Sequence, residues 1–367
     1  MTEQELSAYI QAIRPADEAA MEAARRRQAQ LAKPPGSLGQ LEEISIRLAG
    51  VTGQVCPAMG KCRVAVFAAD NGVVAEGVSC TPPAVTLQQA VNMTFRKTGM
   101  SAMAAAFGDD VSVVDVGIDG DVPPVGVLDR KVRRGTGDIA REDAMTRQQV
   151  LNAMAAGMEQ AARARADGMT ALGIGEMGIG NTTTSAAVLA ALTGADIEAV
   201  TGRGGGLTDE GFLRKKEVLR QALALHRPDG NDVIGVLAGV GGLDLAAMTG
   251  AFLGCAHERV PAAVDGFISI AAALCAVRLC PAVRDVLFLS HDSYEVGYRI
   301  AAEALGLQPC LRLGMRLGEG SGCPLLFRVL EGACGVMRGM ATFGEASIED
   351  SYLDEIRAMD AFTVEGA

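Results

Sequence analysis

The stretch MTALGIGEMGIGNTTTSAAVLAALTG, residues 169–194, predicts a buried strand, a glycine-rich turn and an alanine-rich helix in that order. Its apolar start is short enough for a strand of a parallel sheet, and Gly194 ends the helical pattern. A strand that enters a helix through glycines is the unit from which nucleotide-binding α/β folds are built. The stretch therefore predicts an α/β protein with a ligand at this turn.

Gly173, Gly175 and Gly178 match the G-x-G-x-x-G pattern of dinucleotide-binding turns. That pattern also needs an acidic residue about 20 positions later, on a second strand, to bind a ribose hydroxyl. Asp196 directly follows the helix, and no second apolar run carries it. Glu176 stands inside the predicted turn, where its charge would repel a pyrophosphate. These residues favour a single phosphate at the helix start, with Glu176 facing a cationic group, over a dinucleotide.

The composition limits the class of protein. The 367 residues carry a net charge of -11, which argues against a nucleic-acid or anionic-membrane partner because those need a basic face. Nine cysteines, an odd number without a C-x-x-C pair, indicate free thiols in a reducing cytosol. The chain begins with an acidic segment and has no apolar stretch of membrane length, so we expect a cytoplasmic protein without a membrane span.

Apolar runs alternate with helical patterns from residue 61 onward. This alternation predicts a Rossmann-like parallel sheet flanked by helices, with ligands beyond the carboxyl ends of the strands. The predicted strands lie in RVAVFAAD, VSVVDVGI, MTALGIG, PAAVDGF, VLFLSHDS and CLRLGMRLGEG.

Both chain ends are predicted to be helical. Helical patterns cover TEQELSAYIQAI, a segment that opens at Pro15, and QLEEISIRLAGVTG, and they return from PLLFRVLEGACGVMRGMATF onward. We therefore predict a small helical domain built from residues 1–60 plus 325–367. Residues 61–324 are predicted to form a large α/β domain that binds a nucleotide and carries the catalytic site.

Polar, glycine-rich segments follow the predicted strands. One more such loop, TGRGGGLTDEGFLRKK, enters a helix that carries Lys215 and Lys216. Backbone N–H groups at two helix starts and a nearby lysine form a cradle for an anion, so these loops predict a phosphate site. Glycine-rich turns also occur for purely structural reasons, and each loop by itself leaves that alternative open.

Other chemistries fit the sequence less well. Ser290, His291 and Asp292 are adjacent, whereas the members of a hydrolase triad meet from separate loops, and the chain has no G-x-S-x-G elbow. The three histidines lack the i, i+4 spacing of a zinc-binding helix. Asp115 lacks a paired acid and a following phosphate loop, so we expect it to cap local backbone instead of holding ribose and magnesium.

Glu319 in GEGSG is the candidate general base. It follows the apolar RLGMRL run and is flanked by Gly318 and Gly320, which allow a ligand to approach the backbone. A carboxyl group at a constricted, apolar strand end tends to have a raised pKa, which suits a base. The alternative is a structural glutamate paired with Arg312 or Arg316.

Eight motifs occur in the order found in one family of enzymes: KPPGSLGQLE, AADNGVVAEGVS, AVTLQQAVNMT, GIGEMGIGNTT, VGGLDLAAMTG, DGF, SHDSYE and RLGEGSG. Over nearly its whole length the chain resembles the nicotinate-nucleotide–dimethylbenzimidazole phosphoribosyltransferases, which make α-ribazole phosphate for the lower ligand of cobalamin. The resemblance implies transfer of the 5-phosphoribosyl group of nicotinate mononucleotide to 5,6-dimethylbenzimidazole, without a cofactor or a metal. It also implies a Rossmann-like sheet, a small helical domain from both chain ends and a homodimer.

The functional residues of that family map onto matching motifs of this chain. Glu319 corresponds to the general base. The residues that correspond to the donor and phosphate site are Glu176, Gly178, Lys215, Ser293, Gly318 and Gly320. Those that correspond to the acceptor site are Thr81, Gln89, Met177 and Leu317, with Gln88 as a second match because AVTLQQ holds two glutamines.

The chemistry that the resemblance implies accounts for the two glutamates. The pyridinium of nicotinate mononucleotide loses its positive charge as it leaves, so it needs no acid, and the reaction requires neither magnesium nor pyrophosphate. A benzimidazole nitrogen attacks the anomeric carbon with inversion, and its other nitrogen loses a proton to Glu319. Glu176 would favour the oxocarbenium-like ribose or the pyridinium.

Two departures from the family pattern leave the acceptor base open. The family has Asp-His-Gly after the first strand, where this chain has Asp70, Asn71 and Gly72, and many members have an aromatic residue at the position of Thr81. One alternative is a paralogue that activates a purine, another benzimidazole or a phenol. A second is a non-catalytic partner subunit in a heterodimer, but retention of both glutamates argues against it.

Overall fold

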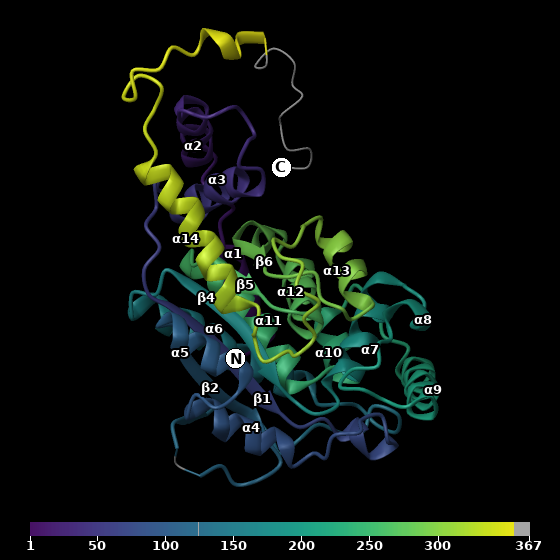
Figure 1. Cartoon of the computed structure of the whole chain (residues 1–367). Helices are drawn as coiled ribbons and strands as arrows, with labels where there is room; N and C mark the ends of the chain where they lie inside the picture. Colours follow the sequence, from purple (N-terminus) through teal and green to yellow (C-terminus); the bar gives the residue numbers. More distant parts are fainter. Residues whose placement is uncertain (124, 356–367) are drawn as a thin grey trace.

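The protein folds around one parallel sheet of six strands (Figure 1). The computed structural model describes residues 1–123 and 125–355. The strands lie side by side in the order β3-β2-β1-β4-β5-β6, and each neighbouring pair runs parallel. This is the Rossmann order, in which the ligand site lies beyond the carboxyl ends of the strands where the order reverses, here between β1 and β4. The strands are β1 (Cys62–Ala69), β2 (Asp110–Gly117), β3 (Val127–Asp129), β4 (Ala171–Met177), β5 (Ala262–Val264) and β6 (Leu287–Leu289).

One predicted strand is absent and one strand was missed. Residues 312–317 of the CLRLGMRLGEG segment have no regular secondary structure, and the segment is joined to its neighbour only by an isolated bridge between His291 and Leu311. Leu313 and Leu317 are each 56% exposed, so the apolar residues of this run do not mark a buried strand. The sixth strand is instead β3 at the sheet edge, whose three residues are too few to show a pattern.

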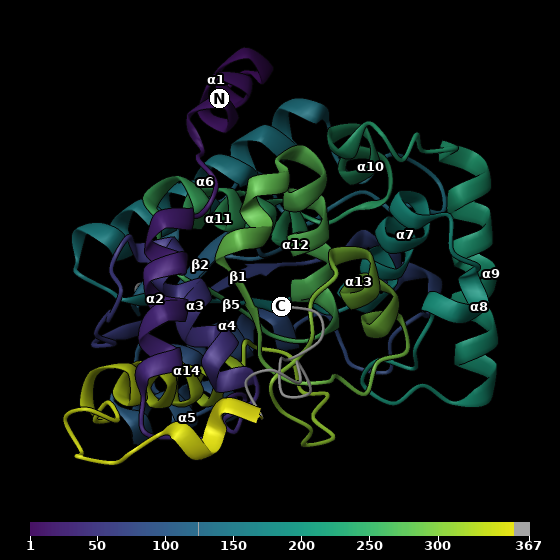
Figure 2. The ribbon, with the colours of Figure 1, turned by 90° about the horizontal axis from the view of Figure 1, so that it is seen from above.

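Helices cover both faces of the sheet. Helices α6 (Arg147–Ala166) and α11 (Leu243–Glu258) lie on one face, and α5 (Gly99–Phe107) and α14 (Cys323–Gly339) lie on the other (Figure 2). In the described part of the chain, no helix is both long enough and apolar enough to cross a membrane. The other elements after β1 are the helices α4 (Val85–Thr94), α7 (Asn181–Thr193), α8 (Ile197–Val200), α9 (Asp209–His226), α10 (Val233–Val240), α12 (Phe267–Leu279) and α13 (Gly297–Leu305) and the 3-10 turns η1 (Gly72–Glu76), η2 (Pro281–Val286) and η3 (Ser351–Leu353).

Helices from both chain ends pack together beside the sheet (Figure 1). Helices α2 (Glu18–Gln30) and α3 (Gln40–Thr52) share a separate apolar cluster with Met337 in the second half of α14. Helix α1 (Glu3–Ala12) instead contacts α11, where Tyr9 stacks on His257 with ring centroids 4.3 Å apart. The division into domains at residues 60 and 325 stays a prediction.

Two predicted helix boundaries were wrong. Helix α2 begins at Glu18, behind the N-cap Asp17, whose carboxylate accepts the N–H of Ala20 at 3.0 Å. Pro15 therefore lies before the helix and does not open it. Helix α14 ends at Gly339, and residues 340–350 contain no helix, because the chain turns back there to bond to α2 and the residues after it. Residues 356–367 of the predicted helical tail lie outside the described part.

The position of α11 depends on its close approach to α6. A Cβ atom on Gly157 of α6 would lie 1.8 Å from the carbonyl oxygen of Ala247, and one on Gly250 of α11 would lie 2.0 Å from that of Met154. Both distances are far below van der Waals contact, so glycine is required at the crossing. Because α11 also packs against β1, β2 and β4, this crossing sets the distance between the helical layer and the sheet.

We predict that Gly157→Ala destabilises the protein, because the added methyl group forces the two helices apart. Overpacking of this kind costs about 1–3 kcal/mol, or more where the backbone has to move, and the melting temperature measured by calorimetry should fall accordingly. The control is Gly332→Ala on an exposed part of α14, where an added Cβ meets nothing within 4 Å. That change should raise stability by up to about 1 kcal/mol, the difference in helix propensity between glycine and alanine. Equal effects from the two substitutions would contradict the close-packing role of Gly157.

Candidate functional site

The three glycines of the predicted dinucleotide pattern allow close packing. A Cβ on Gly173 would lie 2.6 Å from the Cβ of Cys323, and one on Gly175 would lie 2.6 Å from the carbonyl oxygen of Glu319. A Cβ on Gly178 would lie 2.5 Å from the carbonyl oxygen of Ala69 in β1. The glycines therefore let β4 approach α14, the Glu319 loop and β1, which explains the pattern without a dinucleotide.

A cavity of about 250 Å³ lies at the carboxyl ends of the strands, where the Rossmann order places it. The starts of α7 and α12 both face it, and neither N-cap residue has a side chain that bonds to the helix, because both N-caps are glycines. The predicted site residues that line the cavity are Thr81, Gln89, Glu176, Met177, Gly178, Ser293, Leu317, Gly318 and Glu319.

Three predicted site residues lie outside the cavity wall. Gln88 is exposed on α4 and only Gln89 lines the cavity, so the structure separates the two glutamines of AVTLQQ. Gly320 packs against β1 and β4, where a Cβ would lie 2.8 Å from a methyl group of Val64. Lys215 is completely buried on α9 and reaches the cavity only through a neighbouring side chain.

Glu319 is held by the start of α5. Its carboxylate accepts the backbone N–H of Met100 at 3.1 Å and a hydrogen bond from the Thr98 side chain. Burial raises the pKa of this carboxyl group, and these hydrogen bonds partly offset the rise. The structural alternative, an ion pair with Arg312 or Arg316, is absent among the described residues.

The backbone around Glu319 is in an uncommon conformation. Gly318, Glu319 and Gly320 all lie in the left-handed region, with φ angles of 79°, 64° and 84°. A left-handed residue other than glycine costs on the order of 1 kcal/mol, so hydrogen bonds elsewhere have to maintain Glu319 in this state. The conformation turns the Glu319 carboxylate toward α5 and the cavity.

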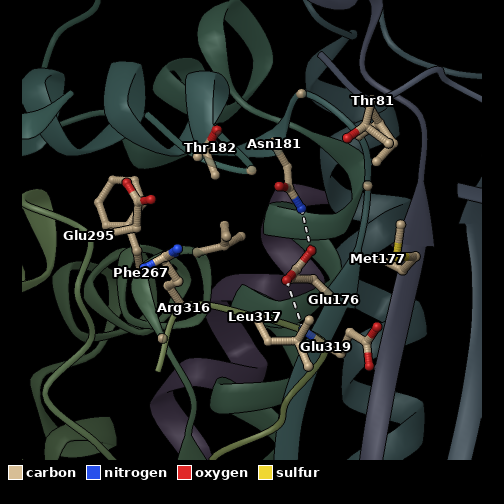
Figure 3. Close-up of a pocket in the computed structure, with 18 of the residues that line it drawn as sticks. Thr81, Glu176, Met177, Asn181, Thr182, Phe267, Glu295, Arg316, Leu317 and Glu319 are labelled. Atoms are coloured by element: carbon tan, nitrogen blue, oxygen red, sulfur yellow. Dashed lines mark hydrogen bonds between the residues drawn. The ribbon is translucent and has the colours of Figure 1, made fainter. Parts of the chain in front are cut away.

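Glu176 belongs to β4 and not to a turn, and its neighbours are not cationic. Its carboxylate accepts the amide of Asn181 at 2.5 Å and the backbone N–H of Glu319 at 3.2 Å (Figure 3). The same Asn181 amide also donates to Asp244 at 3.0 Å. Burial, with a contribution from the nearby Asp244, raises the pKa of Glu176 to about 8. No cationic side chain contacts Glu176 among the described residues, so the cationic group expected beside it stays a prediction about the ligand.

Lys215 lies behind the wall of the cavity, next to Thr182. Its ammonium donates to the hydroxyl of Thr182 at 2.8 Å, close to Gly204 in the glycine-rich loop. Burial lowers the pKa of Lys215 to about 8, so an anion nearby would favour its charged form. The cradle thus combines the α7 start, the Gly204 loop and a lysine, and Ser293 lines the same cavity.

The second helix start at the cavity is not the predicted one. The sequence indicated α9, but its first turn lies beyond the cavity, where Thr208 caps it. The start of α12, with Gly266 and Phe267, lines the cavity instead. The DGF motif that precedes α12 was the available signal, because it places an uncapped glycine at a helix start directly after a strand.

Sequence reasoning missed Asp265, Asn181 and Thr182 as site residues, although each stands in a quoted motif. All three line the cavity, and Asp265 and Asn181 are buried. Asn71, at the position of the family histidine, is buried behind them, where its amide donates to the carbonyl of Ile179 at 3.4 Å. Its side-chain oxygen has no hydrogen-bond partner among the described residues.

The contacts of other residues decide between their competing interpretations. The Ser290 hydroxyl lies 3.0 Å from Nδ1 of His291, but both residues are buried, so they offer no exposed nucleophile. Asp115 accepts the N–H groups of Gly117 and Ile118, which confirms it as a capping residue. Within residues 1–123 and 125–355 no group of three or more His, Cys, Asp or Glu side chains is arranged to hold a metal ion.

We predict that Glu176→Gln removes a pH dependence of stability. Because the pKa of Glu176 is about 8 in the folded protein and ordinary in the unfolded chain, the folded state retains a proton that the unfolded state loses between about pH 4.5 and 8. The wild type therefore loses stability as pH rises through this window, and the glutamine variant does not lose this contribution. The difference in unfolding free energy between the variant and the wild type, measured by urea unfolding, should shift in favour of the variant by roughly 2–5 kcal/mol from pH 5 to pH 8.5.

The control for this measurement is Glu18→Gln, an exposed glutamate of α2 that pairs with Arg25 at 2.8 Å. Its stability difference from wild type should be nearly independent of pH in the same range. A Glu176→Gln difference that stays constant from pH 5 to 8.5 would show that Glu176 is ionised in the folded protein.

Comparison with known proteins identifies close relatives over nearly the full chain. A family described as phosphoribosyltransferase matches residues 13–348. The nicotinate-nucleotide–dimethylbenzimidazole phosphoribosyltransferase of Clostridium perfringens is 46% identical over 93% of this chain and 94% of its own, and that of Geobacter metallireducens is 45% identical over 94% and 98%. The crystal structure of CobT from Thermus thermophilus superposes with a TM-score of 0.88 at 45% identity, covering 91% of this chain and 100% of the other.

Proposed function

This chain belongs to the nicotinate-nucleotide–dimethylbenzimidazole phosphoribosyltransferase family, and we propose that Glu319 and Glu176 divide the work of its reaction between them. The enzyme transfers the phosphoribosyl group of nicotinate mononucleotide to an aryl base, giving α-ribazole 5'-phosphate and nicotinate when that base is 5,6-dimethylbenzimidazole. The observation that carries the proposed division is the placement of two buried carboxylates on one cavity, next to an anion cradle and a glycine-lined wall.

The donor fits the cavity with its phosphate toward Lys215 and its ring beside Glu176. The α7 start, Gly204 and Thr182, with Lys215 behind it, supply N–H groups, a hydroxyl and a positive charge for the phosphate. Nicotinate mononucleotide carries a positive pyridinium, which would place a cation beside the buried Glu176. Its charge would draw a proton off Glu176, and the carboxylate then stabilises the positive charge that spreads to the ribose as the glycosidic bond breaks.

The acceptor fits between Thr81 and Glu319. One nitrogen of the benzimidazole attacks the anomeric carbon from the face opposite to the pyridinium, and the electron pair of the broken bond stays on nicotinate. The other nitrogen gives its proton to the carboxylate of Glu319, which is buried and has a raised pKa. The product is inverted at the anomeric carbon, and no charge remains on the new base.

Two broader features belong to the same proposal. The exposed apolar side chains of Tyr294, Leu313 and Leu317, the last of which lines the cavity, support association with a second copy of the chain, as a homodimer. The alternative is a heterodimer with a paralogue. In that case the chain purified alone would sediment as a monomer. The nine cysteines are all free, which supports a cytoplasmic location.

We predict that Glu319→Gln folds normally but loses most of its turnover. Removal of a general base typically costs on the order of 10²–10⁴-fold in kcat. The acid limb of the wild-type pH profile should lie above the ordinary glutamate range, because burial raises the pKa of Glu319, and it should disappear in the variant. Activity within a few-fold of wild type at neutral pH would refute the assignment.

Lys215→Met should raise KM for nicotinate mononucleotide by roughly 10- to 100-fold and leave KM for the aryl base nearly unchanged. This is because the substitution removes the positive charge behind Thr182, at the end of the cavity proposed to bind the phosphate of the nucleotide. The matched control is Lys216→Met on the same helix, because Lys216 pairs with Glu198 away from the cavity. Equal rises of KM for both substrates would mean that Lys215 maintains the fold instead.

The acceptor end of the cavity should be permissive. Thr81 offers no aromatic ring for stacking, so apolar contacts such as Met177 and Leu317 have to distinguish flat bases. A methyl group in such a pocket is worth about 1–3 kcal/mol, so 5,6-dimethylbenzimidazole should exceed benzimidazole in kcat/KM by roughly 10- to 200-fold at most for each of its two methyl groups. Met177→Ala should bring the ratio closer to one. Three outcomes would contradict this view of the pocket. They are complete refusal of benzimidazole, a preference for a purine or a phenol as acceptor, and a ratio that Met177→Ala leaves unchanged.

A further inference from the structure

The Glu319 loop lacks support from its own secondary structure. Residues 318–322 belong to no helix or strand, and three successive residues in the loop are left-handed. The buried backbone N–H groups of such a loop require acceptors outside it. The acceptors found there are side-chain carboxylates from two other elements.

Asp265 is the main acceptor for this loop. Each of its two carboxylate oxygens binds a different N–H group, since Oδ2 accepts that of Gly320 at 3.0 Å and Oδ1 accepts that of Gly322 at 2.7 Å. Both N–H groups lie within three residues after Glu319 in the chain. Glu176 accepts the N–H of Glu319 itself at 3.2 Å, so the loop is held at three points.

Asp265 is itself rigidly placed between β5 and α12. It is 2% exposed, and its carboxylate lies 3.9 Å from Nδ1 of His291. The loop also packs directly on the SHDS motif, because a Cβ on Gly322 would lie 2.3 Å from the Ser290 hydroxyl and 2.4 Å from His291. The DGF, SHDS and GEGSG motifs therefore meet in one hydrogen-bonded cluster, in which the loop has no space to slide.

We propose that Asp265 is a positioning residue, which holds the Glu319 carboxylate in place for proton transfer by binding the N–H groups of Gly320 and Gly322. This inference rests on the proposed role of Glu319 as the general base. Each oxygen of Asp265 accepts a backbone N–H group of the loop, so the proposed role acts through the loop, although Asp265 also borders the cavity. A displacement of about 1 Å at a reacting group lowers turnover by up to about 100-fold, which sets the expected effect.

The test is Asp265→Asn, which keeps the shape of the side chain but points an amide N–H at a backbone N–H that needs an acceptor. We expect kcat to fall roughly 10- to 100-fold, with KM for both substrates within about three-fold of wild type. The matched control is Asp115→Asn at the end of β2, since Asp115 is also buried and also accepts two backbone N–H groups, but lies away from the cavity. Asp115→Asn should lower stability with little change in kcat. If Asp265→Asn does not fold by circular dichroism, Asp265→Ser, which can accept one N–H, takes its place in the same measurements.

A double substitution separates positioning from general damage. In a Glu319→Gln background, single-turnover rates with excess enzyme should fall by no more than about three-fold when Asp265→Asn is added, because the group that it positions is already gone. A larger further loss, or a kcat in Asp265→Asn equal to wild type, overturns the proposal. The two hypotheses fail separately: a fully active Glu319→Gln variant refutes the base, whereas an inactive Glu319→Gln beside a fully active Asp265→Asn refutes only the positioning.

Discussion

The geometry of the cavity depends on one close approach between backbones. Gly175 near the end of β4 has no side chain, so the backbone of Glu319 and Gly320 lies directly against the strand. A Cβ at that position would lie 2.6 Å from the carbonyl oxygen of Glu319, so any larger residue would displace the loop. The contact places Glu319 beside Glu176, which is the next residue of the strand, and the two carboxylates therefore reach the same cavity from different elements. The proposed base, the donor contact and the cavity wall all follow from it.

The same arrangement brings several buried acidic groups together. Glu176, Asp265 and Glu319 line one cavity, and Asp244 lies behind Glu176 on the amide of Asn181. Buried carboxylates are costly unless hydrogen bonds or opposite charges compensate them. Here backbone N–H groups and one amide compensate in part, and burial raises the pKa values of Glu176 and Glu319. In the proposed reaction a cationic donor completes the compensation, and its charge disappears as nicotinate forms, which weakens the hold on the product.

The sequence predicted the parallel sheet flanked by helices, because burial and the periodicity of apolar residues are local properties. Alternating apolar runs and helices indicated the parallel sheet, and Gly194 ended α7 where expected. The failures have local causes as well. CLRLGMRL looks like a strand, yet Leu313 and Leu317 are exposed and Leu317 lines the cavity, since apolar residues also serve contact surfaces and ligand pockets. Glu176 was expected in a turn because glycines usually end strands, but in β4 they permit packing and the strand continues to Met177.

By itself the sequence determined the α/β architecture and the glycine-capped start of α7. Through eight ordered motifs, two of which contain Glu176 and Glu319, it also determined the family of the chain. These are properties of residue type and spacing along the chain. Only the tertiary structure decided that Gln89 and not Gln88 faces the cavity, that Lys215 stands behind Thr182, and that Asp265 bonds to the loop of Glu319. Each of those facts depends on which segments distant in sequence come within hydrogen-bond reach. That proximity follows from the packing of whole helices and strands, which no local pattern of residues encodes.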